Sequence, residues 1–172
     1  MAISRKVATA SVAVAALATT VFGAAQASAD PIAGGCSGGQ FDFTTSPLSM
    51  VSRPTTATWS GNLTGCTNTP APTATVSGTF EGTGSCLDVA GNIDGSINWS
   101  NGQVSRIRGP WHVPGGVGAA STNTVVIVEG PGAGTQMAVD NGGIINATAM
   151  TAPCLTGDVR GASVAITAVR FS

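Results

Sequence analysis

The chain has few charged side chains and very few basic ones. Asp, Glu, Lys and Arg make up 9% of the 172 residues, and after residue 29 there are five arginines, eight acidic residues and no lysine. Nucleic-acid binding and attraction to an anionic membrane surface both need clustered basic side chains. The composition therefore argues against both partners, and it predicts a mostly neutral, polar surface rich in Thr, Ser, Asn and Gly.

Familiar catalytic motifs are missing as well. His112 is the only histidine, it precedes a Gly/Pro-rich loop, and no Gly-x-Ser-x-Gly elbow is present, so a Ser/His/Asp site is not indicated. The Gly-rich runs at 115–118 and 130–134 lack the Gly-Lys-Ser/Thr of a phosphate loop. Several acidic residues stand beside Gly or Asn in expected turns, which explains them without glycoside hydrolysis: Asp88, Asp94 and Asp140. We expect neither enzyme activity nor a cofactor.

The first 29 residues have the three parts of a secretory signal peptide: a basic pair (Arg5-Lys6), an apolar run rich in Ala and Val (7–25) and a small-x-small site (27–29). A transmembrane anchor, the alternative, needs about 20 apolar residues and usually larger ones. We expect cleavage before Asp30, which leaves one secreted domain, 30–172. No second apolar span follows, so we predict no integral membrane segment after cleavage and a location outside the cell or in its envelope.

Four cysteines follow the expected cleavage site: Cys36, Cys66, Cys86 and Cys154. An even count in an exported chain indicates two disulfides, and no pair has the spacing of a zinc site, so we expect no metal. Segments 39–45 and 55–65 look like an antiparallel hairpin, in which paired residue numbers have a constant sum. Cys36 and Cys66 nearly match that sum, which predicts the pairs Cys36–Cys66 and Cys86–Cys154.

Period-two alternation of apolar and polar residues, bounded by Gly, Pro and Asn, recurs through residues 30–172. It predicts about eight to nine short-linked strands without crossover helices, which makes an all-β antiparallel sandwich or barrel. Glycines stand on the inward rows, as strongly bent strands require: Gly61, Gly78, Gly95 and Gly109. Neither the length nor the pattern decides between the two architectures.

Three local features carry sharper expectations. Asn101-Gly102 is typical of a two-residue type I′ hairpin turn, which places Trp99 opposite Val104 and requires a bulge at 105–106. Residues 140–143 (Asp-Asn-Gly-Gly) predict another hairpin turn, with a strand following at 144–150. The continuous apolar run 125–128 indicates a strand covered on both faces, or a functional apolar face.

The three tryptophans are candidates for stacking on a ligand. Two of them, Trp59 and Trp99, fall on inward rows, so core packing is expected for them. Trp111, beside the Gly/Pro loop, is the candidate binding residue, and we expect its ring on the surface.

Three segments resemble a group of small exported four-cysteine β proteins of actinobacteria: 58–66 (TWSGNLTGC), 77–80 (SGTF) and 97–102 (INWSNG). The shared pattern is Ser-Gly-x-Leu-x-Gly-Cys, a Gly-Thr strand leading to a second Cys, and Trp-x-Asp/Asn-Gly. The resemblance implies a β fold and an exported location, and it carries over no catalytic residue.

The sequence therefore predicts a non-catalytic exported domain that binds a neutral partner: a glycan, another protein or a second copy. One alternative is an inhibitor of a secreted hydrolase that presents a rigid Gly/Pro loop, either 110–120 or 130–134. Another alternative is an envelope pore, whose strands need an apolar outside and a polar lumen.

Overall fold

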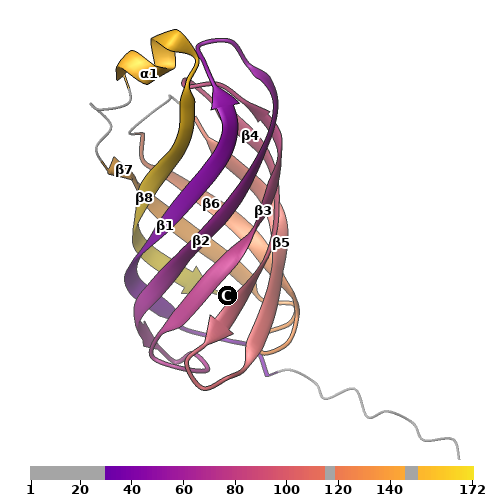
Figure 1. Ribbon diagram of the computed structural model, residues 1–172. Helices are drawn as coiled ribbons and strands as arrows, with labels where there is room; N and C mark the ends of the chain where they lie inside the picture. The colour runs from indigo at the N-terminus through magenta and orange to yellow at the C-terminus, as the bar shows by residue number, and fades with distance from the viewer. Residues whose placement is uncertain (1–29, 115–118, 146–150) are drawn as a thin grey trace, which may run out of the picture.

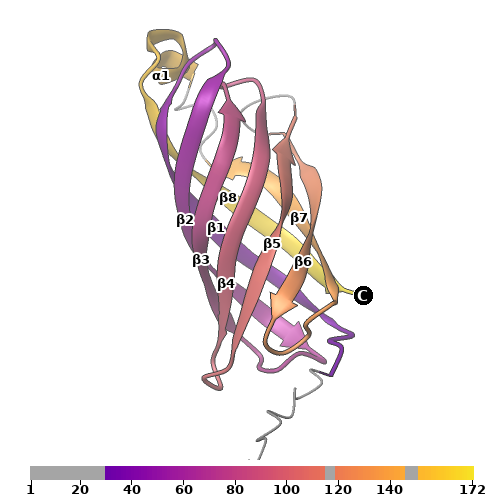
Figure 2. The ribbon, with the colours of Figure 1, turned by 90° about the vertical axis from the view of Figure 1, so that its right-hand side faces the viewer.

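The alternating sequence builds eight antiparallel strands that close into a barrel in the order β1 to β8, with β8 paired to β1 (Figures 1 and 2). The computed structural model describes residues 30–114, 119–145 and 151–172. The expected signal peptide, the Gly-rich run at 115–118 and most of the expected strand 144–150 lie outside these residues. The elements are β1 Gly35–Leu48, β2 Arg53–Thr67, β3 Ala74–Gly84, β4 Val89–Trp99, β5 Val104–Val113, β6 Ser121–Glu129, β7 Gln136–Ile145, α1 Thr151–Thr156 and β8 Val159–Phe171.

The predicted all-β class is confirmed, and of its two architectures the barrel is observed. Both predicted disulfides, Cys36–Cys66 and Cys86–Cys154, are present. The hairpin prediction is confirmed, because the residue numbers of each β1–β2 pair add up to the same value. Cys36 therefore lies opposite Cys66, and Phe43 lies opposite Trp59.

The turn expected at 140–143 is wrong, because β7 runs through these residues. Its pairing with β8 shifts register after Asp140 and again after Asn141, and Gly143 has a φ of 98° within this irregular stretch. The Asn-Gly-Gly sequence therefore distorts a strand and does not reverse the chain, which lowers the strand count to eight.

A short helix, α1, precedes β8 where no helix was expected. The Thr156 hydroxyl donates to the carbonyl oxygens of Ala152 and Pro153, and the Asp158 N–H donates to the Pro153 carbonyl at 2.9 Å. Gly157, with a φ of 76°, ends the helix in the left-handed conformation that such caps require. Local capping thus makes a helix that is too short to show periodicity. Among the described residues no helix is long and apolar enough to cross a membrane.

The β4–β5 hairpin also differs from the expected type I′ turn. The Trp99 N–H donates to the Gln103 carbonyl, so the loop is the three residues 100–102, of which Gly102 has a φ of 87°. The extra loop residue shifts the phase of β5 by one position. Ser105 then faces inward, Val104 is 45% exposed, and β4 pairs with β5 in continuous register. Both the inward Val104 and the bulge between these strands were wrong expectations.

Ser105 occupies its buried position because it meets a hydrogen-bonding demand there. The indole N–H of Trp99 donates to Ser105 Oγ at 2.9 Å, and Ser105 Oγ donates to the Pro131 carbonyl at 2.7 Å. A buried indole N–H needs an acceptor, which Val104 does not offer.

The inward glycines make room for aromatic rings. Gly78 and Gly95 face each other on β3 and β4, and a Cβ added to either would meet Cζ2 of Trp59 at 2.6 or 2.5 Å. Gly61 stands in the same relation to Phe41, since its added Cβ would meet the Phe41 ring at 2.8 Å. The Trp59 ring therefore lies against these two facing glycines, where no side chain competes for the space. It also stacks on Phe41, with ring centroids 5.6 Å apart.

The run 125–128 alternates as an ordinary strand. Val125 and Ile127 are buried in the barrel, whereas Val126 and Val128 are 39% and 46% exposed on its outer wall. The expectation that both faces are covered is wrong for the described residues.

The two ends of the barrel differ. The end that carries the β2–β3, β4–β5 and β6–β7 connections is closed by apolar side chains, among them Ile32, Trp99 and Phe171. The Ile32 N–H donates to the Thr135 hydroxyl, and the rings of Trp99 and Phe171 lie 6.1 Å apart. The opposite end carries the β1–β2 and β3–β4 connections and α1 (Figure 1). We call this end the mouth.

Candidate ligand-binding cavity in the barrel mouth

A cavity of about 90 Å³ opens inside the barrel at the mouth. Its walls come from strands all around the barrel, because the inward positions near the end of each strand converge there. Most of these side chains are apolar, including Phe43, Ala57, Phe80, Trp111, Val159 and Val164. The cavity therefore has the character of a ligand site, concave and apolar with a few polar groups.

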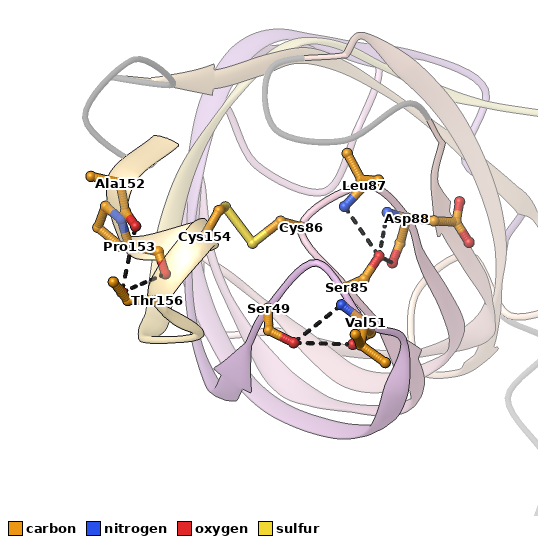
Figure 3. Close-up of a disulfide and its surroundings, with 10 residues drawn as sticks. All are labelled: Ser49, Val51, Ser85, Cys86, Leu87, Asp88, Ala152, Pro153, Cys154 and Thr156. Atoms are coloured by element: carbon orange, nitrogen blue, oxygen red, sulfur yellow. Dashed lines mark hydrogen bonds between the residues drawn. A yellow bond between two sulfur atoms is a disulfide. The ribbon is translucent and has the colours of Figure 1, made fainter.

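One side of the mouth is held by the second disulfide. Cys86 in the β3–β4 connection is joined to Cys154 in α1, and both pack with Leu48 and Val159 in a small separate core (Figure 3). The hydroxyl of Ser85 accepts hydrogen bonds from the N–H groups of Leu87 and Asp88, each at 3.1 Å. These contacts fix the β3–β4 connection at the rim.

Apolar side chains are exposed on the same rim. Leu87 follows Cys86 in the β3–β4 connection and is 52% exposed, and Leu155 follows Cys154 in α1 and is 74% exposed. Met50 and Val51 in the β1–β2 connection are also exposed. All four residues lie in connections or α1 at the mouth end, and none of them lines the cavity itself. We refer to these four residues as the apolar rim.

Trp111, the candidate binding residue, lines this cavity but does not lie on the surface. Its side chain is 4% exposed and packs near Phe41 and Phe43, with ring centroids 6.3 and 6.4 Å away. The expected surface ring is corrected, because β5 continues in phase from Ser105 and turns Trp111 inward. Its role in binding stays a prediction.

A polar network joins β5, β6 and β7 at the cavity. Backbone pairing between β5 and β6 involves only residues 106–108 of β5. Farther along β5, the His112 N–H donates to a side chain of β6 instead, Asn123 Oδ1, at 2.6 Å. The Nδ2 groups of Asn123 and Asn141 donate to the Ser121 hydroxyl at 3.4 and 3.1 Å. Asn123 and Asn141 are 5% and 3% exposed. The network thus holds two amides inside the barrel.

Two polar atoms at the cavity lack partners. Asn141 Oδ1 and Thr45 Oγ1 are buried without a hydrogen bond to any residue that the structure describes, and both residues line the cavity. The sequence pattern singled out neither residue, and Asn141 was assigned to a turn. The signal was present, because Asn141 continues the inward row of Met137 and Val139 at a spacing of two.

Within the described part of the chain, His112 pairs with Asp88 and with no serine. Its Nε2 lies 2.8 Å from Asp88 Oδ1, and both side chains are 53% exposed. Ser85, the nearby buried serine, uses its hydroxyl in the turn at Leu87 and Asp88, and no hydrogen bond joins it to His112. Within residues 30–114, 119–145 and 151–172, no three His, Cys, Asp or Glu side chains gather as a metal site.

The irregular part of β7 is tied to its neighbours on the outer wall. Asp140 accepts hydrogen bonds from Thr122 on β6 at 2.8 Å and from Arg170 on β8. The hydrogen bond from Arg170 holds the pKa of the Asp140 carboxyl below its ordinary value, with a further contribution from Thr122, while burial opposes the shift. Asp140 thus braces β7 from outside where Asn141 turns inward.

This bracing predicts a pH dependence. The folded-state pKa of Asp140 lies below the unfolded value of about 3.9, so its stabilising contribution is present above that value and is lost as pH falls through the folded pKa. Asp140→Asn should lower Tm by about 2–3 °C near neutral pH and by less at an acidic pH below the unfolded value. Asp158→Asn, which removes an ion pair within one segment, is the control. Thermal melts that show the same Tm difference at both pH values would contradict this assignment.

No protein-family model, no curated protein and no solved structure matches this chain.

Proposed function

We propose that the protein is an exported, non-catalytic binding protein whose barrel mouth takes up a neutral, largely apolar small ligand. The observation that carries this proposal is the apolar cavity open at one end of a barrel whose other end is closed. Among the described residues that line the cavity, Asp88 is the one ionisable side chain, and it stands at the rim beside His112. An anionic ligand would find no opposite charge in this lining, and a cationic one would find only the rim carboxylate of Asp88, which already contacts His112, so a neutral ligand is favoured.

The size of the cavity bounds the buried part of the ligand. An engineered apolar cavity of about 150 Å³ binds benzene. The mouth cavity of about 90 Å³ is smaller but open, so a single ring or a short alkyl chain fits partly inside. The remainder of the ligand would contact the apolar rim.

Two structural disulfides are compatible with an oxidising extracellular environment. Together with the expected signal peptide they support export, so the ligand would be met outside the cell or in its envelope.

The other hypotheses receive less support from the described residues. The exposed large apolar side chains include no Trp or Phe on which a sugar ring would stack. The segment 130–134, offered as an inhibitory loop, is a tight turn in which Gly132 packs on Ile32. A pore has an apolar outside and a polar lumen, whereas apolar side chains fill this barrel and Thr, Ser and Asn cover most of its wall.

Filling the cavity tests the proposal. Ala162 lines the cavity on β8, so Ala162→Leu should weaken binding of a short neutral alcohol at least tenfold by occupying the same space. Trp111 is the one tryptophan at the cavity, so its fluorescence reports binding by titration.

Ala165→Leu is the matched control, since Ala165 lies on the same strand between the inward Val164 and Ile166 and does not line the cavity. Equal affinities of the two variants would place the ligand elsewhere. Retention of the wild type on insoluble glycans, without any response to small apolar ligands, would replace this proposal with glycan binding.

A further inference from the structure

The unpartnered amide oxygen of Asn141 defines the chemistry that the cavity recognises. Asn141 is 3% exposed, lines the cavity and has no hydrogen bond from Oδ1 to any described residue. A buried acceptor without a donor is destabilising, so few such groups persist in folded proteins. An acceptor left free in an otherwise apolar cavity is explained by a donor that arrives with a ligand.

One hydrogen bond sets which end of the amide faces the cavity. Asn141 Nδ2 donates to the Ser121 hydroxyl on β6 at 3.1 Å. The same hydroxyl accepts from Asn123 Nδ2, whose Oδ1 accepts from the His112 backbone N–H. With its Nδ2 on Ser121, Asn141 presents Oδ1, an acceptor, to the ligand.

Thr45 Oγ1 is the other buried polar atom of the cavity wall that has no hydrogen bond to a described residue. Its neighbour Thr44 pairs with Gly161 of β8, whereas Asn141 pairs with Ile166. The two polar atoms therefore lie at different depths of the barrel, and one ligand hydroxyl does not reach both.

We propose that the ligand is a neutral alcohol: an alkyl chain or single ring whose hydroxyl group donates to Asn141 Oδ1. This inference rests on the proposed function, because it assigns the polar end of the ligand whose apolar part occupies the cavity. Asn141 is then a binding residue. The absence of a basic side chain from the described cavity wall separates an alcohol from a carboxylate of the same length.

Two isomers test the assignment without any mutation. Hexanol and dipropyl ether have the same atomic composition, but only hexanol carries a hydrogen-bond donor. Titration of the oxidised protein, followed by Trp111 fluorescence and by calorimetry, should show hexanol binding about tenfold more tightly than the ether. Hexanoate at neutral pH should bind more weakly than hexanol, because its charge has no partner in the cavity.

Conservative variants then locate the contact. Thr45→Val keeps the shape of the side chain and removes Oγ1, the other free polar atom of the described cavity wall. It is the matched control and should leave the preference for hexanol unchanged, because Thr45 lies beside the Thr44–Gly161 pair and Asn141 lies opposite Ile166. Asn141→Leu should abolish the preference while the ether still binds, and the wild-type comparison of isomers stands even where this variant fails to fold.

The outcomes separate this inference from the function on which it rests. Equal affinity for hexanol and dipropyl ether would overturn the assignment of an alcohol and leave an apolar binding site. Preferential binding of hexanoate would overturn the neutral assignment. If neither isomer binds, while circular dichroism shows a folded barrel, both the inference and the proposed function are wrong.

Discussion

Removing the disulfide at the mouth, by replacing Cys86 and Cys154 with serine, is expected to lower the free energy of unfolding by about 4 kcal/mol. The two cysteines are 68 residues apart, and in the chain-entropy model a bridge of that span restricts the unfolded chain by this amount. Urea denaturation of both proteins measures the loss, which corresponds to a decrease in Tm of roughly 10 °C for a domain of this size.

The same variant should also weaken ligand binding, because Cys86 lines the cavity and its bridge holds α1 against the rim. The control is Cys36→Ser with Cys66→Ser, which breaks a bridge of 30 residues between β1 and β2. That variant should lose about 3–4 kcal/mol of stability but keep its ligand affinity once folded. Equal loss of affinity in both variants would show that the disulfide at the mouth has no local role in the site.

Adding one methyl group beneath Trp59 should destabilise the barrel by about 3 kcal/mol or more. A Cβ on Gly95 would lie 2.5 Å from Cζ2 of Trp59 and 2.6 Å from the Ser77 carbonyl oxygen, so both a ring and a backbone would have to move. Overpacking of a filled core typically costs about 1–3 kcal/mol, and the backbone contact adds to it. Chemical denaturation of Gly95→Ala measures the effect.

Gly38→Ala is the matched substitution, because a Cβ there meets its nearest neighbours at 3.7 Å, an ordinary contact distance. It should change stability by less than about 1 kcal/mol. Combining Gly95→Ala with Trp59→Phe should recover part of the loss, since a smaller ring leaves space for the methyl group, and this coupling is read from a double-mutant cycle. Strictly additive effects of the two substitutions would show that Trp59 is not the group displaced.

Much of the fold was predictable from local patterns. Alternation at a spacing of two assigned most strands and their inward faces, since successive side chains of a strand point to opposite sides. Cys36 could be paired with Cys66 because the residue numbers of opposite positions in an antiparallel hairpin have a constant sum. Both rules act within one strand or one strand pair, so no knowledge of the rest of the molecule was needed.

The errors arose where a distant contact decided a local choice. Asn101-Gly102 suits a two-residue turn, but the three-residue loop turns Ser105 inward, where its hydroxyl accepts from the Trp99 indole and donates to the carbonyl of Pro131, a residue outside the hairpin. Residues 140–143 suit a turn, but Thr122 and Arg170 on the neighbouring strands hold Asp140 within β7. In each case the alternatives differ by little locally, and the tertiary partner decides between them.

The candidate site shows the same division. The alternating pattern and the cysteines already specified an all-β chain with two disulfides, because strand periodicity and hairpin pairing are local properties. Closure of β8 on β1 and the free oxygen of Asn141 were decided by the tertiary structure alone. A cavity is the space left between side chains from strands far apart in the sequence, and only the closed barrel determines which of those side chains meet.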